Sequence, residues 1–174
     1  MSGGVDSSVA ALLLKQQGYK VVGVFFKPWQ PRGKYINCNW QKDRQDALAV
    51  ASKLKIDFKT WDFSKEYKHE ITDYMIQSYK NGFTPNPDIV CNEKIKFGIF
   101  LKKALARGAD FIATGHYARL KYNKKENAYE LHRAEDTEKD QTYFLYKLKQ
   151  KQLKYCFFPI GNYKKQDVRK MAKK

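Results

Sequence analysis

The sequence predicts an α/β fold, with a parallel sheet covered by helices on both faces. Two observations support this prediction. Helical and extended patterns alternate along the chain, and segments 20–26 and 57–63 have the composition of strands separated by a helical stretch. This order implies right-handed crossover connections. Sheets of this kind bind ligands at the carboxyl ends of their strands, so functional residues are expected there.

The first half of the chain is predicted to form three helices around two strands. The elements up to the second strand are a helix ending at Gly18, strand 20–26, helix 40–54 and strand 57–63. Ser64 can cap a third helix, which Asn81-Gly82 ends.

The second half begins with "TPNPD" at 84–88, which cannot continue a helix because its prolines remove donors and favour extended backbone. A lysine-rich helix is expected to close the sequence, and the chain divides into residues 1–118 and 119–174. The elements predicted in between are a helix over 97–108, a strand over 110–116, a hairpin over 118–134 and a helical stretch from 140.

Composition indicates a globular protein. Hydrophobic residues make up 43% and aromatic residues 15%, which argues against disorder. No apolar run approaches the ~20 residues that span a bilayer, and no basic and apolar leader precedes the first loop. We therefore expect a soluble, cytoplasmic protein with no membrane partner.

The net charge is strongly positive. It is +16, from 34 basic and 18 acidic residues spread along the chain. Such a field attracts polyanions, above all nucleic acid. Solvated surface lysines account for it equally well, so charge supports an RNA-binding hypothesis without establishing one.

The opening string "SGGVDSS" has the character of a phosphate-binding loop. Gly3 and Gly4 let backbone amides approach an anion, and Ser7 and Ser8 stand where a helix N-terminus offers unpaired donors. The string is not a Walker A loop, since no Gly-Lys-Ser/Thr closes it. By composition alone, an ordinary turn is the simpler interpretation.

A carboxylate and a thiol follow the two prolines. Asp88 and Cys91 stand three residues apart and could face one cleft. Cys91 is predicted to lie just ahead of a helix, whose dipole would favour the thiolate. The alternative is a rigid turn with a small buried cysteine. Cys38 and Cys156 form no CxxC pair with it, which argues against a zinc knuckle and a disulfide framework.

Two further segments are compatible with ligand binding. Gly115 and His116 follow a predicted strand at its carboxyl end, either near a ligand or in a plain strand-ending turn. In the segment "WQPRGKY", aromatic rings could stack on bases and basic side chains could meet phosphates, or the rings could pack locally. The residues concerned are Trp29, Arg32, Lys34 and Tyr35.

Taken as strings, these motifs resemble known families. "SGGVDSS" resembles the PP-loop of the ATP pyrophosphatase superfamily, whose adenine nucleotide alpha hydrolase-like fold is Rossmann-like. "TPNPDIVCNEKIKF", "ATGHYAR" and "KDQTYFLY", in this order, resemble the tRNA-specific 2-thiouridylases. Synthetases that share the PP-loop lack the PNPD-C string. The resemblance implies a sulfurtransferase that uses ATP and Mg²⁺ to exchange the C2 oxygen of the wobble uridine of tRNA for sulfur.

The resemblance also implies roles for particular residues. Cys91 would be the catalytic cysteine and Asp88 its acid/base neighbour, while Asp6 would lie near the magnesium ion. ATP would be held by Ser2, Gly3, Gly4, Asp6, Ser7, Ser8, Gly115 and His116. The tRNA, with its flipped-out uridine, would meet Gln141, Asn86, Lys139 and Asp140.

Parts of the family pattern are expected to lie outside these residues. A strand should precede the opening loop, and a second cysteine, which accepts persulfide sulfur from a relay protein, should follow residue 174. Cys38 is interpreted as structural and Cys156 as a core residue. Two rival functions remain open, namely another PP-loop synthetase that adenylates a small acid, and a catalytically incomplete tRNA-binding fragment.

Overall fold

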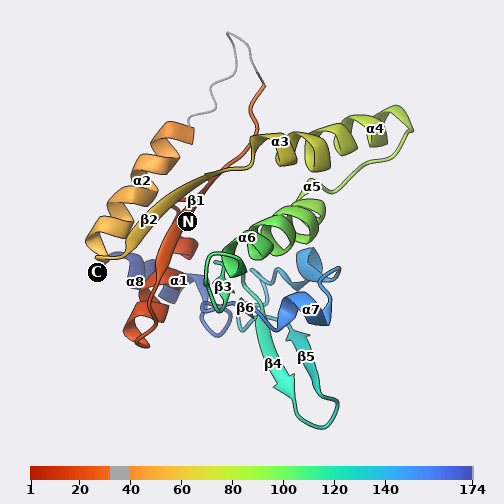
Figure 1. Ribbon diagram of the computed structural model, residues 1–174. Coiled ribbons are helices and arrows are strands. Elements are labelled where there is room, and N and C mark those ends of the chain that lie inside the picture. The colour runs from red at the N-terminus through yellow and green to blue at the C-terminus, as the bar shows by residue number, and fades with distance from the viewer. Residues whose placement is uncertain (32–39, 174) are drawn as a thin grey trace. The chain divides into compact units, whose positions relative to one another are not determined.

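The computed structural model describes residues 1–31 and 40–173, which belong to two compact units, Met1–Pro85 and Asn86–Lys174 (Figure 1). The predictions for Arg32, Lys34, Tyr35 and Cys38 lie outside the described residues. No helix in the described part of the chain is both long and apolar enough to cross a membrane.

A parallel strand pair forms the centre of the first unit. Strand β1 (Val22–Lys27) pairs with β2 (Asp57–Asp62), with Phe25 opposite Thr60. Helix α2 (Trp40–Lys53) packs against both strands through fully buried Ala47 and Ala51, whose small side chains allow a close approach (Figure 1). Both strands and the helix between them are confirmed.

Helix α1 (Val5–Gln16) precedes β1 and is also confirmed, since it ends shortly before Gly18. One side of α1 is apolar because branched and small residues recur at helical spacing. Its buried residues are Val9, Ala10, Ala11, Leu13 and Leu14.

After β2 the chain forms a helical run of three parts, α3 (Ser64–Tyr67), the π-helix η1 (Lys68–Asp73) and α4 (Tyr74–Lys80). The prediction that Ser64 caps this run is wrong, because Phe63 occupies the cap position and Ser64 is the first helical residue. The carboxylate of Asp62 accepts the Ser64 amide at 2.9 Å instead. Asp62 also accepts a bond from Lys27 at 2.7 Å, and together these contacts lower its pKa to about 2.

The second unit begins with a continuous helical run, and here the predicted start is wrong. Helix α5 (Pro87–Val90) leads into the π-helix η2 (Cys91–Phe100) and then α6 (Leu101–Leu105). Pro87 is tolerated because it occupies the first helical position, where its missing N–H has no intrahelical partner. The Asn86 side chain caps the run by accepting the amides of Asp88 at 3.1 Å and Ile89 at 3.4 Å.

A second parallel pair and a hairpin follow. Strand β3 (Ile112–Ala113) pairs with β6 (Cys156–Phe157), and β4 (Arg119–Asn123) pairs antiparallel with β5 (Ala128–His132), so the hairpin is confirmed. The stretch predicted to be helical from 140 forms only the short 3₁₀-helix η3. The remaining elements are η3 (Thr142–Leu145), α7 (Gln150–Leu153) and the lysine-rich α8 (Lys165–Lys173), which is confirmed. The chain is thus a mixed α/β protein with parallel strand pairs.

Candidate functional site

The opening loop owes its shape to two adjacent glycines. Gly3 has φ +77°, and a Cβ placed on it would lie 2.8 Å from Cβ of Asp46 and 2.9 Å from the amide nitrogen of Ala47. No larger residue fits, so the loop backbone lies directly on α2. Gly4 then occupies the cap position of α1, and no side chain caps the first amides of that helix.

Three serine hydroxyls surround these amides. The hydroxyls of Ser2 and Ser7 lie 3.3 Å apart, and those of Ser7 and Ser8 donate to the Gly4 carbonyl at 3.2 and 2.9 Å. Asp6 lies in the first turn of the helix. Amides without a side-chain cap, neighbouring hydroxyls and the positive end of a helix dipole form a suitable environment for a phosphate group.

In the second unit, Asp88 and Cys91 lie one helical turn apart in the run that starts at Pro87. The prediction that Cys91 precedes a helix is therefore wrong, and a helix N-terminus does not favour its thiolate. Burial raises the pKa of the Cys91 thiol, the charge of Asp88 raises it further, and the ammonium of Lys96 opposes both effects. The thiol form of Cys91 is favoured in this environment.

Lys96 was missed by sequence reasoning. It follows Cys91 by five residues, and the i to i+5 periodicity of the π-helix places the two on one side, which an α-helix would not do. Gly98 permits this geometry, because a Cβ there would lie 2.9 Å from the Glu93 carbonyl oxygen. The only signal in the sequence was the string "CNEKIKF", and it is readable only once the helix type is known.

His116 lies near the same lysine. It follows β3 as predicted, its Nδ1 is 2.7 Å from the Thr114 hydroxyl, and its ring packs against Phe97 and Phe158. Burial and the positive charge of Lys96 lower the pKa of His116 to about 3. The imidazole is therefore neutral at physiological pH. Lys96 thus acts electrostatically on both Cys91 and His116, and Asp88 acts on Cys91.

The residues proposed to meet tRNA form local contacts of their own. The Gln141 side-chain oxygen accepts a hydrogen bond from the backbone amide of Tyr117 at 2.9 Å. The backbone amide of Gln141 donates to the Tyr117 carbonyl at 2.8 Å. Asp140 accepts the amide of Ala134 at 2.7 Å and the hydroxyl of Thr142 at 2.5 Å. Lys139 is exposed. Gln141 and Asp140 therefore fix the loops on either side of the hairpin.

The described cysteines are free. Cys156 is buried, which raises its pKa to about 12, and its thiol donates to the Gln152 carbonyl at 3.1 Å. Its interpretation as a core residue is confirmed. Over residues 1–31 and 40–173, no group of three or more His, Cys, Asp or Glu side chains could hold a metal ion. Asp6, which was expected near a magnesium ion, is an acidic residue in the first turn of α1.

These observations define the class of the chain as an α/β protein with a candidate phosphate-binding loop and a separate cysteine–carboxylate pair. Residues 1–174 match the tRNA methyl transferase HUP domain family, and the chain belongs to that family.

Curated relatives agree with the predicted resemblance to 2-thiouridylases. The chain is 52% identical over 176 residues to the tRNA-specific 2-thiouridylase MnmA of Christiangramia forsetii, with 99% of this chain and 45% of the relative aligned. It is 51% identical over 176 residues to the MnmA of Flavobacterium johnsoniae, with 99% of this chain and 45% of the relative aligned. It is 49% identical over 174 residues to the MnmA of Methylobacillus flagellatus, with 100% of this chain and 48% of the relative aligned. The chain spans about half the length of these relatives.

Proposed function

We propose that the chain is the ATP-binding catalytic part of a tRNA-specific 2-thiouridylase, which replaces the C2 oxygen of the wobble uridine with sulfur. The observation that carries the proposal is the Asp88–Cys91 pair, placed one helical turn apart beside Lys96. Relatives that are 52% and 51% identical to the chain are named tRNA-specific 2-thiouridylases, which supports the assignment. The finer fold that we propose is a PP-loop domain, with one parallel sheet between helices, in a cytoplasmic protein.

The opening loop fits the ATP phosphates. Its uncapped amides offer donors to an anion, and close packing of Gly3 on α2 fixes the direction of the loop. The Ser7 and Ser8 hydroxyls would turn from the Gly4 carbonyl towards a bound phosphate. Asp6 would hold Mg²⁺ together with the phosphates. ATP supplies the activation of the uridine C2 oxygen by adenylation, which makes it a good leaving group.

Cys91 then requires a proton acceptor, because burial favours its thiol form. Asp88 is the carboxylate placed to take that proton, and Lys96 stabilises the resulting thiolate. After a persulfide on a second cysteine has displaced AMP at C2, the Cys91 thiolate attacks the sulfur of that cysteine. A disulfide forms, the transferred sulfur stays on C2, and a thiol reductant restores both cysteines.

The remaining residues are assigned to the nucleotide and to the tRNA. Gly115 and neutral His116 would border the nucleotide at the end of β3, and Gln141 would meet the extruded uridine. Asn86, Lys139 and Asp140 would support the tRNA, and a persulfide relay protein would supply the sulfur. Each of these is a proposal that activity measurements can test.

The test is mass-spectrometric detection of 2-thiouridine in a tRNA transcript incubated with the full-length protein, ATP, Mg²⁺ and a persulfide donor. Cys91→Ser should abolish the product, whereas Cys156→Ala, at a buried thiol, should retain it as long as the protein stays folded. Thiolation by Cys91→Ser would refute the catalytic role of this residue. Pyrophosphate release without RNA would favour a synthetase, and salt-sensitive tRNA binding without ATP turnover would favour an RNA-binding fragment.

A further inference from the structure

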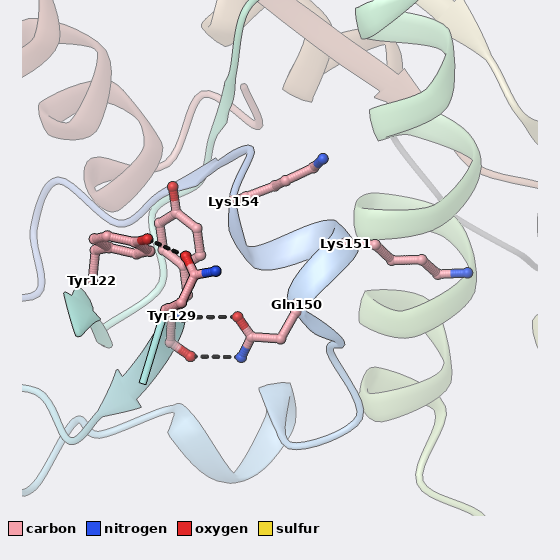
Figure 2. A pocket seen from close by; sticks show the side chains of 6 residues that line it. Tyr122, Tyr129, Gln150, Lys151 and Lys154 are labelled. Carbon is pink, nitrogen blue, oxygen red and sulfur yellow. Dashed lines mark hydrogen bonds between the residues drawn. The ribbon is translucent and has the colours of Figure 1, made fainter. Parts of the chain in front are cut away.

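A surface groove lies between the hairpin and α7, away from the residues assigned above. It has a volume of about 410 Å³ and is lined by Tyr122, Asn127, Tyr129, Gln150, Lys151 and Lys154, hereafter the hairpin groove. Figure 2 shows the rings of Tyr122 and Tyr129 side by side, with Lys151 of α7 and Lys154, which follows it, extending away from the rings. Its lining thus combines aromatic rings, amides and cations, and it contains no carboxylate.

The rings are held in place by backbone pairing. Tyr122 lies opposite Tyr129 in the register, and the amide and carbonyl of Tyr129 bond to the Gln150 side chain at 2.7 and 2.8 Å rather than to β4. A pair of this non-hydrogen-bonded type brings its side chains close together. The ring centroids are accordingly 5.1 Å apart, and the Tyr122 hydroxyl donates to Asn127 (Figure 2).

The acidic residue of β5 lies on the opposite face of the hairpin. Glu130 follows Tyr129, and successive strand residues point to opposite faces. Its carboxylate accepts the Asn123 amide at 2.6 Å and lies 3.0 Å from Nε2 of His132. The positive charge of Lys151 and Lys154 on the groove side is therefore not offset by a neighbouring carboxylate in the groove lining.

We propose that the hairpin groove binds a segment of RNA, with a base against Tyr122 and Tyr129 and phosphates near Lys151 and Lys154. The inference rests on the proposed function, and it adds a contact surface outside the Asp88–Cys91 pair. Exposed aromatic rings bordered by cations bind unpaired nucleotides through stacking and phosphate attraction. The ammonium of Lys154, which lines the groove, lies 4.7 Å from the centre of the Tyr155 ring.

The experiment measures the Kd of a tRNA transcript for the full-length protein as a function of salt. Tyr122→Ala should weaken binding about tenfold, whereas Tyr122→Phe, which keeps the ring, should bind as the wild type does. The double change Lys151→Gln with Lys154→Gln should lower the slope of log Kd against log salt by about 2. Lys121→Gln and Lys124→Gln together remove the same charge; Lys121 is exposed on the Glu130 face and Lys124 lies in the hairpin turn.

Four outcomes separate the hypotheses. Losses confined to Tyr122→Ala and to the Lys151 and Lys154 variant support the hairpin groove. If both variants bind tRNA with wild-type affinity and thiolation is intact, RNA binding at the hairpin groove is refuted, while the proposed function is unaffected. Equal losses in the groove and control lysine variants also refute binding at the groove, because they indicate only nonspecific attraction between the basic surface and RNA. Absence of tRNA binding by the wild type would refute the RNA substrate itself.

Discussion

The side chain of Asn92, next to Cys91 and only 2% exposed, donates a hydrogen bond from Nδ2 to the carbonyl of Phe144 at 3.0 Å. This bond joins η2, which carries the candidate catalytic cysteine, to η3, which directly follows Gln141. The Oδ1 atom of Asn92 is buried and has no hydrogen-bond partner among the described residues. The Asn92 side chain thus anchors η3 to η2 through a single hydrogen bond.

Replacing Asn92 by Ala should destabilise the fold by about 1–3 kcal/mol, because the Phe144 carbonyl loses its donor. Urea unfolding measures this change. Gln77→Ala removes an exposed 3.4 Å bond to Asn81 and serves as the control, with an expected loss of less than about 0.5 kcal/mol. Equal losses in the two variants would show that the Asn92 bond contributes nothing particular.

The reactivity of Cys91 should respond in opposite directions to its two charged neighbours. Lys96→Met removes the charge that lowers the pKa of Cys91, so alkylation by iodoacetamide near neutral pH should slow several-fold. Asp88→Asn removes a charge that raises this pKa, so alkylation should accelerate by a similar factor.

The measurement is the alkylation rate of Cys91 against pH, with Cys156→Ala as the common background so that one described thiol remains. Asp88→Asn should also impair thiolation despite the faster alkylation, since it removes the proposed proton acceptor. A change of the same sign in both variants would contradict the electrostatic account.

His116 should make the fold sensitive to acid. Its pKa is about 3 in the folded protein, below its ordinary value of 6.5, so the unfolded state binds the proton more readily. Its contribution is complete above pH 6.5 and declines as the pH falls towards 3, by on the order of a few kcal/mol. His116→Gln should flatten the stability curve over this window, measured by urea unfolding at several pH values. An unchanged slope below pH 6.5 would argue against a depressed pKa.

Gly3 and Gly4 should differ sharply in their tolerance of alanine. Gly3→Ala places a Cβ against α2 at a positive φ and should cost at least about 1–2 kcal/mol. Gly4 has φ −71° and its nearest obstacle is the flexible Ser2 hydroxyl at 3.3 Å, so Gly4→Ala should cost only about 0.5–1 kcal/mol, because alanine is a poorer cap residue than glycine. Thermal unfolding of both variants compares the two adjacent positions directly. Similar losses would show that backbone packing on α2 does not limit the loop.

The sequence was sufficient to predict the elements whose signals are local. Apolar residues at helical spacing predict α1 and α2, and polar turn residues between two alternating segments predict the β4–β5 hairpin. The sequence also indicated that Asp88 and Cys91 could share one cleft, but it did not predict the helical turn that places them three residues apart on one side.

Two signals were misread, and only the second of them depends on tertiary context. Pro87 reads as a helix breaker until Asn86 is recognised as the cap that makes it a first helical residue. The π-helix that brings Lys96 alongside Cys91 depends on packing, in which the Gln152 amide donates to the Phe97 carbonyl at 2.8 Å. Gln152 comes far later in the sequence, so no local pattern identifies it.

The Gln150 side chain also affects the outer edge of β5, because it bonds to the backbone of Tyr129 there. A hairpin has outer strands whose unpaired amides and carbonyls can recruit a strand from another molecule and so begin aggregation. At Tyr129 both groups are already engaged by one glutamine, which does there what an additional strand would do. The helix carrying it also places Lys151 and Lys154 beside this edge, where like charge repels a second copy. At Tyr129 the outer edge of β5 is thus closed to pairing with a strand of another molecule.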